Sequence, residues 1–269
     1  MGKLSLEFST GQNGKTYLKN QYASYPFHIC KAQYFENDPP GMANIYIQSA
    51  SGGIYEDDSL VTGVVANSNS YSHITTQAST IVHGMPKGMA YQTVDVNVTG
   101  NSYMEYMSDP LILFPESKLN SKTNVFADLS STAVITDSFL LHFLKNDKQI
   151  FKQLNSSLQV YSEENELLAK DTYWMNSKNF LSKRHIYIGM STIYLIDRSN
   201  ARQHLLELLQ NFMKQNKDIY GGASRLPNNC GMIIKFLAKD GDMLKKTVQQ
   251  IWMAIRESIV GIKPNIRKK

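Results

Sequence analysis

The feature that most constrains this chain is an unbroken succession of strand-like segments that runs to residue 198. In these segments apolar and polar residues alternate, or β-branched residues follow one another, as β-strands require. In the stretch TVDVNV, Val94 and Val96 face one side while Asp95 and Asn97 face the other. Segments of this kind lie at 59–65, 71–84, 91–98, 102–107, 132–143, 158–163 and 185–197, with turn sequences such as NGK, NDPPG and SGG between the strand-like parts of the chain.

Helical periodicity begins only after residue 198. The segment 199–215 starts at a possible N-cap, Ser199, and 242–261 starts at Asp242 and ends at a glycine. A buried strand is predicted between them, at 232–237. We therefore expect one domain over residues 1–269, with a strand-rich body (1–198) and an α/β C-terminal cap (199–269) that carries two helices. The pattern by itself favours mainly antiparallel pairing and contains no convincing fixed-period repeat.

Composition narrows the class of protein. At 269 residues and 42% hydrophobic, the chain can bury a large core, and its net charge of +5 is modest. No RNA-binding aromatic signature, zinc-finger spacing or basic helix face is present, so no nucleic-acid partner is expected. The N-terminus lacks the apolar region of a signal peptide, and no window approaches 18 uninterrupted apolar residues. These observations predict a cytoplasmic protein without a membrane partner.

Catalytic and metal-binding motifs are missing from the sequence. It contains no G-x-S-x-G elbow, no P-loop, no Rossmann glycines and no H-E-x-x-H. Cys30 and Cys230 lie far apart in the chain and form no C-x-x-C pair, and the histidines make no ligand cluster. The sequence therefore predicts no catalytic residue and no tight metal site.

Two polar stretches interrupt the strands, and the residues alone leave the role of each open. SGGIYEDD at 51–58 is either a cation site or a solvated acidic turn; if it is extended, only Glu56 and Asp58 share a face. TTQAST at 75–80 is either the lining of a polar cavity or an exposed strand that uses threonine for its β-propensity.

The order of these stretches along the chain resembles the pattern of a known family. A Gly-Gly turn ending in Asp is followed by a Thr-Thr-Gln strand and then by SYMEYMSDPLILF, as in the urease accessory protein family UreD, also called UreH. The opening strand pair and the closing GGASRLP…IVG segment are similar as well, so the resemblance spans nearly the whole chain. The matching positions are Gly52, Gly53, Asp58, Thr75, Thr76, Gln77, Met104, Glu105, Pro110, Ile112 and Phe114.

The resemblance implies a mainly β, β-helix-like fold and a maturation factor that is not an enzyme. Members of the family bind UreF, recruit UreG through it, dock on the urease apoprotein and deliver nickel through an internal polar channel. A dimer formed through the UreF complex is left open. No cofactor is implied to be tightly bound, and nickel(II) is held transiently, which suits oxygen ligands better than a Cys/His cage.

The resemblance also implies roles for particular residues. Glu56 and Asp58 become candidate carboxylates of the nickel path or its mouth, and Gly52 and Gly53 become a structural turn. The remaining path candidates are Thr75, Thr76, Gln77 and Glu105.

The sequence departs from the family at a few positions. Asp57 stands where the family usually has Gly, Ile81 where it usually has Lys, and the segment 137–147 lacks an Arg. The alternative function is a β-rich carbohydrate-binding module that uses Tyr173 and Trp174 as stacking platforms.

Overall fold

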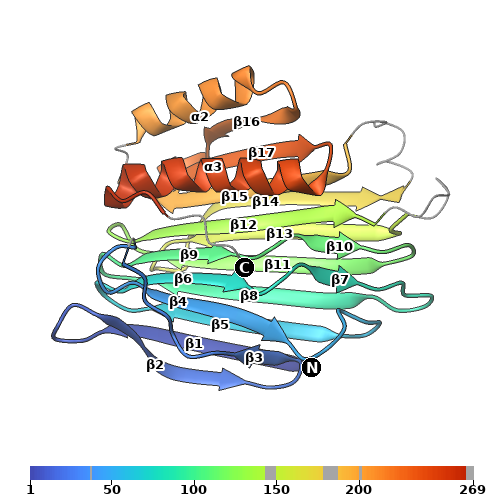
Figure 1. Ribbon diagram of the computed structural model, residues 1–269, viewed down its shortest axis with the longest axis horizontal. Helices are drawn as coiled ribbons and strands as arrows, with labels where there is room; N and C mark the ends of the chain where they lie inside the picture. The colour runs from blue at the N-terminus through green and yellow to red at the C-terminus, as the bar shows by residue number, and fades with distance from the viewer. Residues whose placement is uncertain (37, 143–149, 178–186, 200–201, 265–269) are drawn as a thin grey trace.

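The computed structural model describes residues 1–36, 38–142, 150–177, 187–199 and 202–264. Its strands form a β-solenoid of about four turns, in which the chain alternates between two facing sheets (Figure 1). The predicted mainly β class, the β-helix-like arrangement and the two C-terminal helices are confirmed.

The first sheet, sheet A, has the strand order β14-β13-β11-β8-β5-β1-β2. The second, sheet B, has the order β16-β17-β15-β12-β9-β6-β4-β3, with β7 and β10 beside it. The strands of sheet A are β1 (Gly2–Thr10), β2 (Thr16–Ala23), β5 (Ser59–Ala66), β8 (Ala90–Val98), β11 (Lys118–Ala127), β13 (Gln153–Tyr161) and β14 (Leu167–Asn176). Those of sheet B are β3 (Phe27–Ile29), β4 (Ala43–Ser49), β6 (Tyr71–Thr76), β7 (Thr80–Val82), β9 (Tyr103–Met107), β10 (Leu111–Leu113), β12 (Thr132–Leu141), β15 (Gly189–Asp197), β16 (Ile219–Arg225) and β17 (Gly231–Ala238).

The prediction of mainly antiparallel pairing is wrong for the central strands of both sheets. In sheet A, β1, β5, β8, β11 and β13 pair in parallel, and in sheet B so do β4, β6, β9 and β12. Antiparallel pairs occur only toward the sheet edges. The alternation of apolar residues reports which face is buried but not the strand direction, and here each connection crosses to the other sheet before it returns.

The solenoid turns repeat in space without an obvious repeat in sequence. Along sheet B, Ala43 lies opposite Ser72, Ser72 opposite Met104, and Met104 opposite Ala133, which is a spacing of roughly 30 residues within the range of solenoid repeats. The residues at equivalent positions differ in type, which explains why no fixed period is visible in the sequence.

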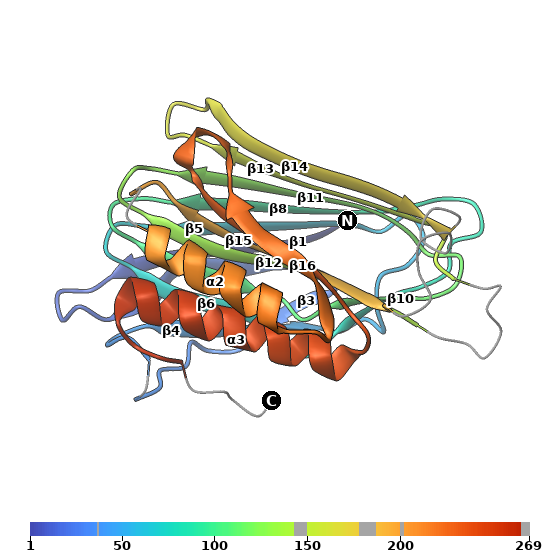
Figure 2. The ribbon, with the colours of Figure 1, turned by 90° about the horizontal axis from the view of Figure 1, so that it is seen from above.

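The helices cover the outer face of sheet B and make a third layer (Figure 2). α2 (Gln203–Gln215) has Arg202 as its N-cap and not the predicted Ser199. α3 (Gly241–Val260) has Asp240 as its N-cap and not the predicted Asp242; the Asp240 carboxylate accepts the N–H of Met243. Gly261 ends α3 in the left-handed conformation, with φ 72°. A 3₁₀ turn, η1 (Pro227–Asn229), precedes β17.

Strands β16 and β17 extend sheet B, so the C-terminal cap shares a sheet with the strand-rich body. Across the described ranges, neither helix combines the length and the apolar character that would let it cross a membrane.

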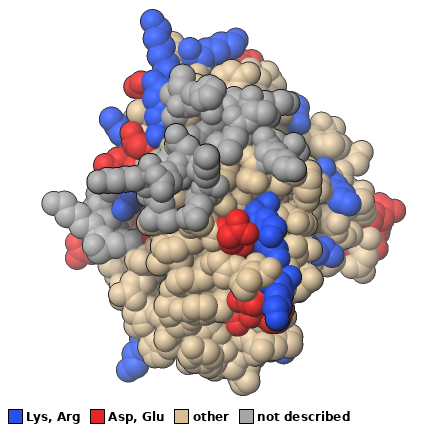
Figure 3. All heavy atoms as spheres, turned by 90° about the vertical axis from the view of Figure 1, so that its right-hand side faces the viewer, with Lys and Arg blue, Asp and Glu red and all other residues tan. Residues whose placement is uncertain are grey.

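A narrow third side joins the two sheets, at the right in Figure 1, where β7 and β10 lie. Successive turns stack aromatic rings there: Tyr55 on His83 with centroids 4.4 Å apart, His83 near Phe114 at 5.6 Å, and Phe114 on His142 at 4.1 Å. On this side of the molecule acidic and basic side chains lie next to one another (Figure 3), so neither sign of charge dominates its visible part.

Gly53 lies on this side of the solenoid and has a φ of 146°, a value that residues with a side chain rarely adopt. A Cβ at this position would lie 2.4 Å from the carbonyl oxygen of Ile81 on the next turn. The glycine is therefore required by the close approach of two turns.

We predict that Gly53→Ala lowers the free energy of unfolding by at least about 1 kcal/mol, because a residue with a side chain is strained at this φ and the Ile81 backbone must move. Urea denaturation measures the change. The matched control is Gly63→Ala on β5, where a Cβ has open space and the change should stay within about 1 kcal/mol. Equal stability of the two variants would contradict the account of this turn.

Candidate functional site

A layer of polar side chains crosses the middle of the solenoid core. Along β5 the inward-facing residues are Leu60, Thr62 and Val64, so a polar residue separates two apolar ones. The inward faces of β8 and β11 follow the same order of apolar, polar and apolar residues. We call this layer the polar belt; its members are Thr62, Thr76, Gln92, Ser121, Thr123 and Asp137.

The polar belt lines a cavity of about 290 Å³ between the two sheets. One water molecule needs about 10–15 Å³ on this measure, so the cavity has room for several. The side-chain carbonyl oxygen of Gln92 is buried and has no hydrogen-bond partner among the described residues. A buried polar atom without a partner costs about 1–3 kcal/mol, so a solvated cavity explains it better than a dry core does.

Asp137 supplies the carboxylate of the polar belt. Its Oδ2 accepts hydrogen bonds from the hydroxyls of Ser156, at 2.6 Å, and Tyr173, at 2.9 Å. Burial raises the pKa of Asp137, and these two hydrogen bonds offset only part of the increase. The carboxyl therefore binds a proton more readily than an exposed aspartate, and a cation in the cavity would compete with that proton.

Sheet B is interrupted beside the cavity. β9 pairs with β6 only as far as Met107 opposite Thr75, and pairing resumes with Leu111 of β10 opposite Thr80. On the next strand, β12 pairs with β9 up to Ile135 and with β10 from Phe139 onward. Residues 76–79, 108–110 and 136–138 thus form a break in the sheet, which we call the sheet B gap.

Side chains replace the missing backbone ladder at the sheet B gap. The hydroxyl of Thr75 donates to the carbonyl oxygen of Met107 at 2.7 Å, and that of Thr76 accepts the N–H of Asp109 at 2.9 Å. Thr136 donates to the carbonyl oxygen of Ser108 at 3.3 Å. The hydroxyl residues here satisfy backbone groups that strand pairing would otherwise satisfy.

The predicted cavity residues divide between two sides of sheet B. Thr76 and Gln77 line the interior cavity, together with Gly52 and Gly53 of the Gly-Gly turn. Thr75 lies on the opposite face of β6 and borders a second cavity beneath α3.

The acidic turn holds Glu56 and Asp58 in place through backbone amides. The carboxylate of Glu56 accepts the N–H of Lys87, at 2.6 Å, and that of Gly88 on the next turn, and these bonds lower its pKa. Asp58 accepts the N–H of Tyr55 at 2.8 Å. The segment is a turn and not a strand, so the two carboxylates bind different backbone groups and do not share a face as they would in an extended segment.

Asp58 lies beside a surface hollow that shares lining residues with the interior cavity. It lines a surface hollow of about 320 Å³ whose lining residues Pro26 and Ser51 also line the interior cavity. Asp57, between the two carboxylates, has φ 62°. That left-handed conformation explains why glycine suits this position and why aspartate, which tolerates it better than most residues, can replace it.

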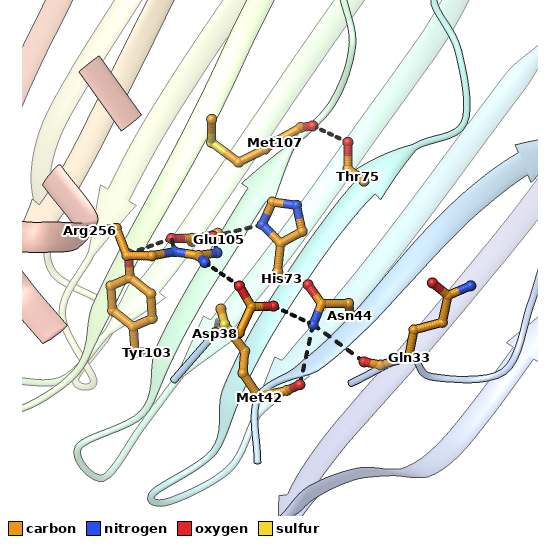
Figure 4. Close-up of polar contacts among 10 residues, drawn as sticks. All are labelled: Gln33, Asp38, Met42, Asn44, His73, Thr75, Tyr103, Glu105, Met107 and Arg256. Carbon is orange, nitrogen blue, oxygen red and sulfur yellow. Dashed lines mark hydrogen bonds and ion pairs between the residues drawn. The ribbon is translucent and has the colours of Figure 1, made fainter. Parts of the chain in front are cut away.

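Glu105 lies outside both cavities, in a buried ion pair with Arg256 of α3 (Figure 4). Arg256 Nε donates to Glu105 Oε1 at 2.7 Å, and a second guanidinium nitrogen bonds Oε2. The hydroxyl of Tyr103 and Nδ1 of His73 also contact this carboxylate, each at 2.6 Å. Burial alone would raise the pKa of Glu105, but the hydrogen bonds and charge of Arg256 hold it well below its usual range.

The same guanidinium reaches a second carboxylate near the N-terminus. Arg256 donates to Asp38 at 2.7 Å, and the other oxygen of Asp38 accepts the side-chain amide of Asn44 at 2.9 Å. Arg256 also lies over the ring of Trp252, 4.7 Å from its centroid. These contacts fix α3 to sheet B and to the loop before β4.

Sequence reasoning missed Arg256 and every member of the polar belt except Thr76, although Arg256 and Asp137 both left a signal. Arg256 follows Ile255 on the apolar stripe of α3, where a charged residue needs a buried partner. Asp137 interrupts the apolar run TAVITDSFLL at the middle of β12. No group of three or more His, Cys, Asp or Glu side chains that could hold a metal ion occurs among the residues that the structure describes.

Comparison with known proteins gives one family over nearly the whole chain. The family described as "UreD urease accessory protein" matches residues 1–268. The chain is 29% identical over 268 residues to urease accessory protein UreD 1 of Pseudomonas syringae pv. syringae, covering 98% of this chain and 94% of the relative. It is 30% identical over 274 residues to UreD 1 of Methylorubrum extorquens, with 98% and 90% covered, and 24% identical over 278 residues to UreD of Yersinia enterocolitica, with 97% and 84% covered.

We predict that Arg256→Met lowers the free energy of unfolding by about 3–5 kcal/mol, because it leaves two buried carboxylates without their cation. Chemical denaturation followed by circular dichroism measures the loss. Lys246→Met on the exposed side of α3 is the matched control and should change stability by less than about 0.5 kcal/mol. An Arg256 variant as stable as the control would show that the ion pair does not hold α3 in place.

Proposed function

The chain belongs to the UreD urease accessory protein family, and on that premise we propose that it passes nickel through its interior cavity to the urease apoprotein. Proteins of this family act in urease maturation as non-catalytic chaperones. The nickel ion is cargo in this proposal and has no permanent site.

The observation that carries the proposal is the polar belt inside an otherwise apolar solenoid. Burying polar groups costs free energy, so a layer of them across several strands is unfavourable unless it serves a ligand. A divalent cation that must move on needs oxygen ligands that lower its desolvation cost without holding it tightly. The cavity lining offers hydroxyl and amide oxygens together with the carboxylates of Asp109 and Asp137, and this set matches that requirement.

The cavity supports a path that begins near the acidic turn. The hollow beside Asp58 meets the cavity at Ser51 and Pro26, and the Gly-Gly turn forms part of the cavity lining. In this proposal Asp58 attracts the cation at the mouth, while Glu56 fixes the turn by binding the backbone of the next one. Thr76, Gln77 and Asp137 then line the route.

The partners in this proposal are UreF, UreG recruited through UreF, and the urease apoprotein, with a dimer formed through the UreF complex. Glu105 is proposed to act indirectly, since its ion pair with Arg256 holds the helical layer against the sheet. The carbohydrate-binding alternative loses one of its two stacking platforms, because Tyr173 points inward and donates its hydroxyl to Asp137.

We predict that Asp137→Asn reduces nickel-dependent activation of urease about tenfold, which corresponds to a barrier raised by about 1.4 kcal/mol, because one of the two carboxylates that line the cavity is lost. Urease activity in cells that carry the accessory proteins is the measurement, with co-purification of the complex as the check on assembly. The control is Asp95→Asn, which changes a carboxylate on the outward face of β8. Full activation by the Asp137 variant would remove this residue from the path.

At the mouth, Asp58→Asn should slow nickel uptake at low nickel concentration, because it removes the charge while the amide oxygen can still accept the N–H of Tyr55. We expect the nickel concentration for half-maximal urease activation to rise by about twofold to tenfold, as for loss of one steering charge. Asp57→Asn is the matched control, since it removes the neighbouring charge outside the hollow and tolerates a positive φ. Identical shifts in both variants would argue for a general charge effect and against a mouth at Asp58.

A further inference from the structure

A second cavity lies on the other side of sheet B, between the sheet and α3. It measures about 100 Å³, and we call it the α3 groove. His73, Thr75 and Met107 form its sheet side, and Gln249 and Trp252 form its helix side. The indole N–H of Trp252 is buried and has no hydrogen-bond partner among the described residues, so the groove, like the interior cavity, has an unsatisfied polar atom in a lining residue.

The two cavities share lining residues at the sheet B gap. Ser108, Asp109 and Ser138 border both the interior cavity and the α3 groove. A continuous sheet would separate these spaces, because side chains alternate between its faces and the backbone closes the wall. No backbone ladder joins residues 108–110 to the neighbouring segments 76–79 and 136–138, although β12 stays paired with β15 there. Between these three segments, side chains such as those of Ser108, Asp109 and Ser138 separate the two cavities.

The orientation of the β12 side chains gives further support for an opening in sheet B. Val134 and Leu140 of this strand pack against the helices, which places the alternate residues Thr136 and Ser138 on the same helix-facing side. Thr136 and Ser138 nevertheless line the interior cavity. Residues of both faces of β12 therefore border the interior cavity beside the sheet B gap.

From this geometry we propose that the sheet B gap is a portal, through which a divalent cation crosses sheet B between the interior cavity and the α3 groove. The inference rests on the proposed nickel path and adds its second opening. The route then has two mouths on different sides of the molecule, one in the hollow beside Asp58 and one beneath α3. α3 lies on the outer face of sheet B (Figure 2), so the partner on that side exchanges the ion next to this helix.

The portal offers oxygen ligands at the point where the cation leaves the larger cavity. Asp109 supplies a carboxylate, and Ser108 and Ser138 supply hydroxyls, where the two cavities share their lining. Oxygen groups that replace part of the cation's hydration shell lower the cost of passage, whereas an apolar side chain would raise it.

The test blocks the portal from the helix side, where the fold tolerates change. Gln249→Trp places a large ring into the α3 groove, and Gln250→Trp adds the same ring to the exposed side of α3 as the matched control. Nickel transfer is measured with the purified accessory complex, loaded with nickel and mixed with urease apoprotein. We expect Gln249→Trp to slow transfer about tenfold, equal to a barrier raised by about 1.4 kcal/mol, and Gln250→Trp to leave it unchanged.

A third variant separates failure of the portal from failure of the nickel path itself. Thr123→Leu fills the interior cavity from sheet A, far from α3. If Thr123→Leu stops transfer and Gln249→Trp does not, the portal is overturned and the interior path stands. If neither variant slows transfer, the path and the portal are both overturned. Slow transfer in both variants, with normal transfer in Gln250→Trp, supports the portal.

Assembly of the Gln249 variant is checked by co-purification with the partner proteins. Should the tryptophan prevent assembly, Gln249→Cys allows the complex to form before a bulky, reducible thiol reagent is attached. Labelling should then slow transfer, and a reductant should restore it. The native complex is treated in the same way as the control; this chain's own thiols are the partly exposed Cys30 and the buried Cys230. Transfer unaffected by labelling would overturn the portal.

Discussion

The buried ion pair of Arg256 is the interaction on which the rest of the structure depends. One guanidinium joins α3 near the C-terminus to Glu105 on β9 and to Asp38 before β4, and all three side chains are almost fully removed from solvent. Burying such charges is expensive, and it is tolerated because the guanidinium nitrogens bind the two carboxylates. His73 and Tyr103 give further partners to Glu105, and Asn44 gives one to Asp38. Together with the apolar contacts of Leu244, Ile251 and Ile255, the network holds α3 against sheet B, and α3 forms the outer wall of the α3 groove.

Inside the solenoid, in contrast to the Arg256 ion pair, the polar side chains of the belt serve the proposed function and not the stability of the fold. The apolar layers above and below the polar belt hold the sheets together. The belt itself contributes little to stability, and among the described residues the side-chain carbonyl oxygen of Gln92 has no partner. A break in the hydrogen bonding of sheet B lies beside the belt. Both features weaken the fold at the same place, as expected for a region kept for the passage of an ion and not for packing.

Much of this could be predicted from the sequence. Strand periodicity identified most of the described strands. The segments TTQAST and SYMEYMSDP, which lie on either side of the break between β6 and β9, were also singled out, although the break itself is visible only in three dimensions. Parallel pairing was missed because alternation has no direction. The role of Glu105 was misplaced because its partner Arg256 is 151 residues away, and a contact at that separation leaves no local pattern. Asp137 was seen only as a departure from the family, since burial decides whether a strand aspartate faces a cavity.

The most direct test of the central claim, that nickel travels inside the solenoid, is anomalous X-ray diffraction at the nickel absorption edge. Crystals of the accessory complex loaded with nickel would be compared with crystals grown without it. The account predicts anomalous density within the interior cavity, near Asp137 or at the sheet B gap between Asp109 and Ser138. Nickel found only on the outer surface, with the cavity free of anomalous density at saturating nickel, would contradict it.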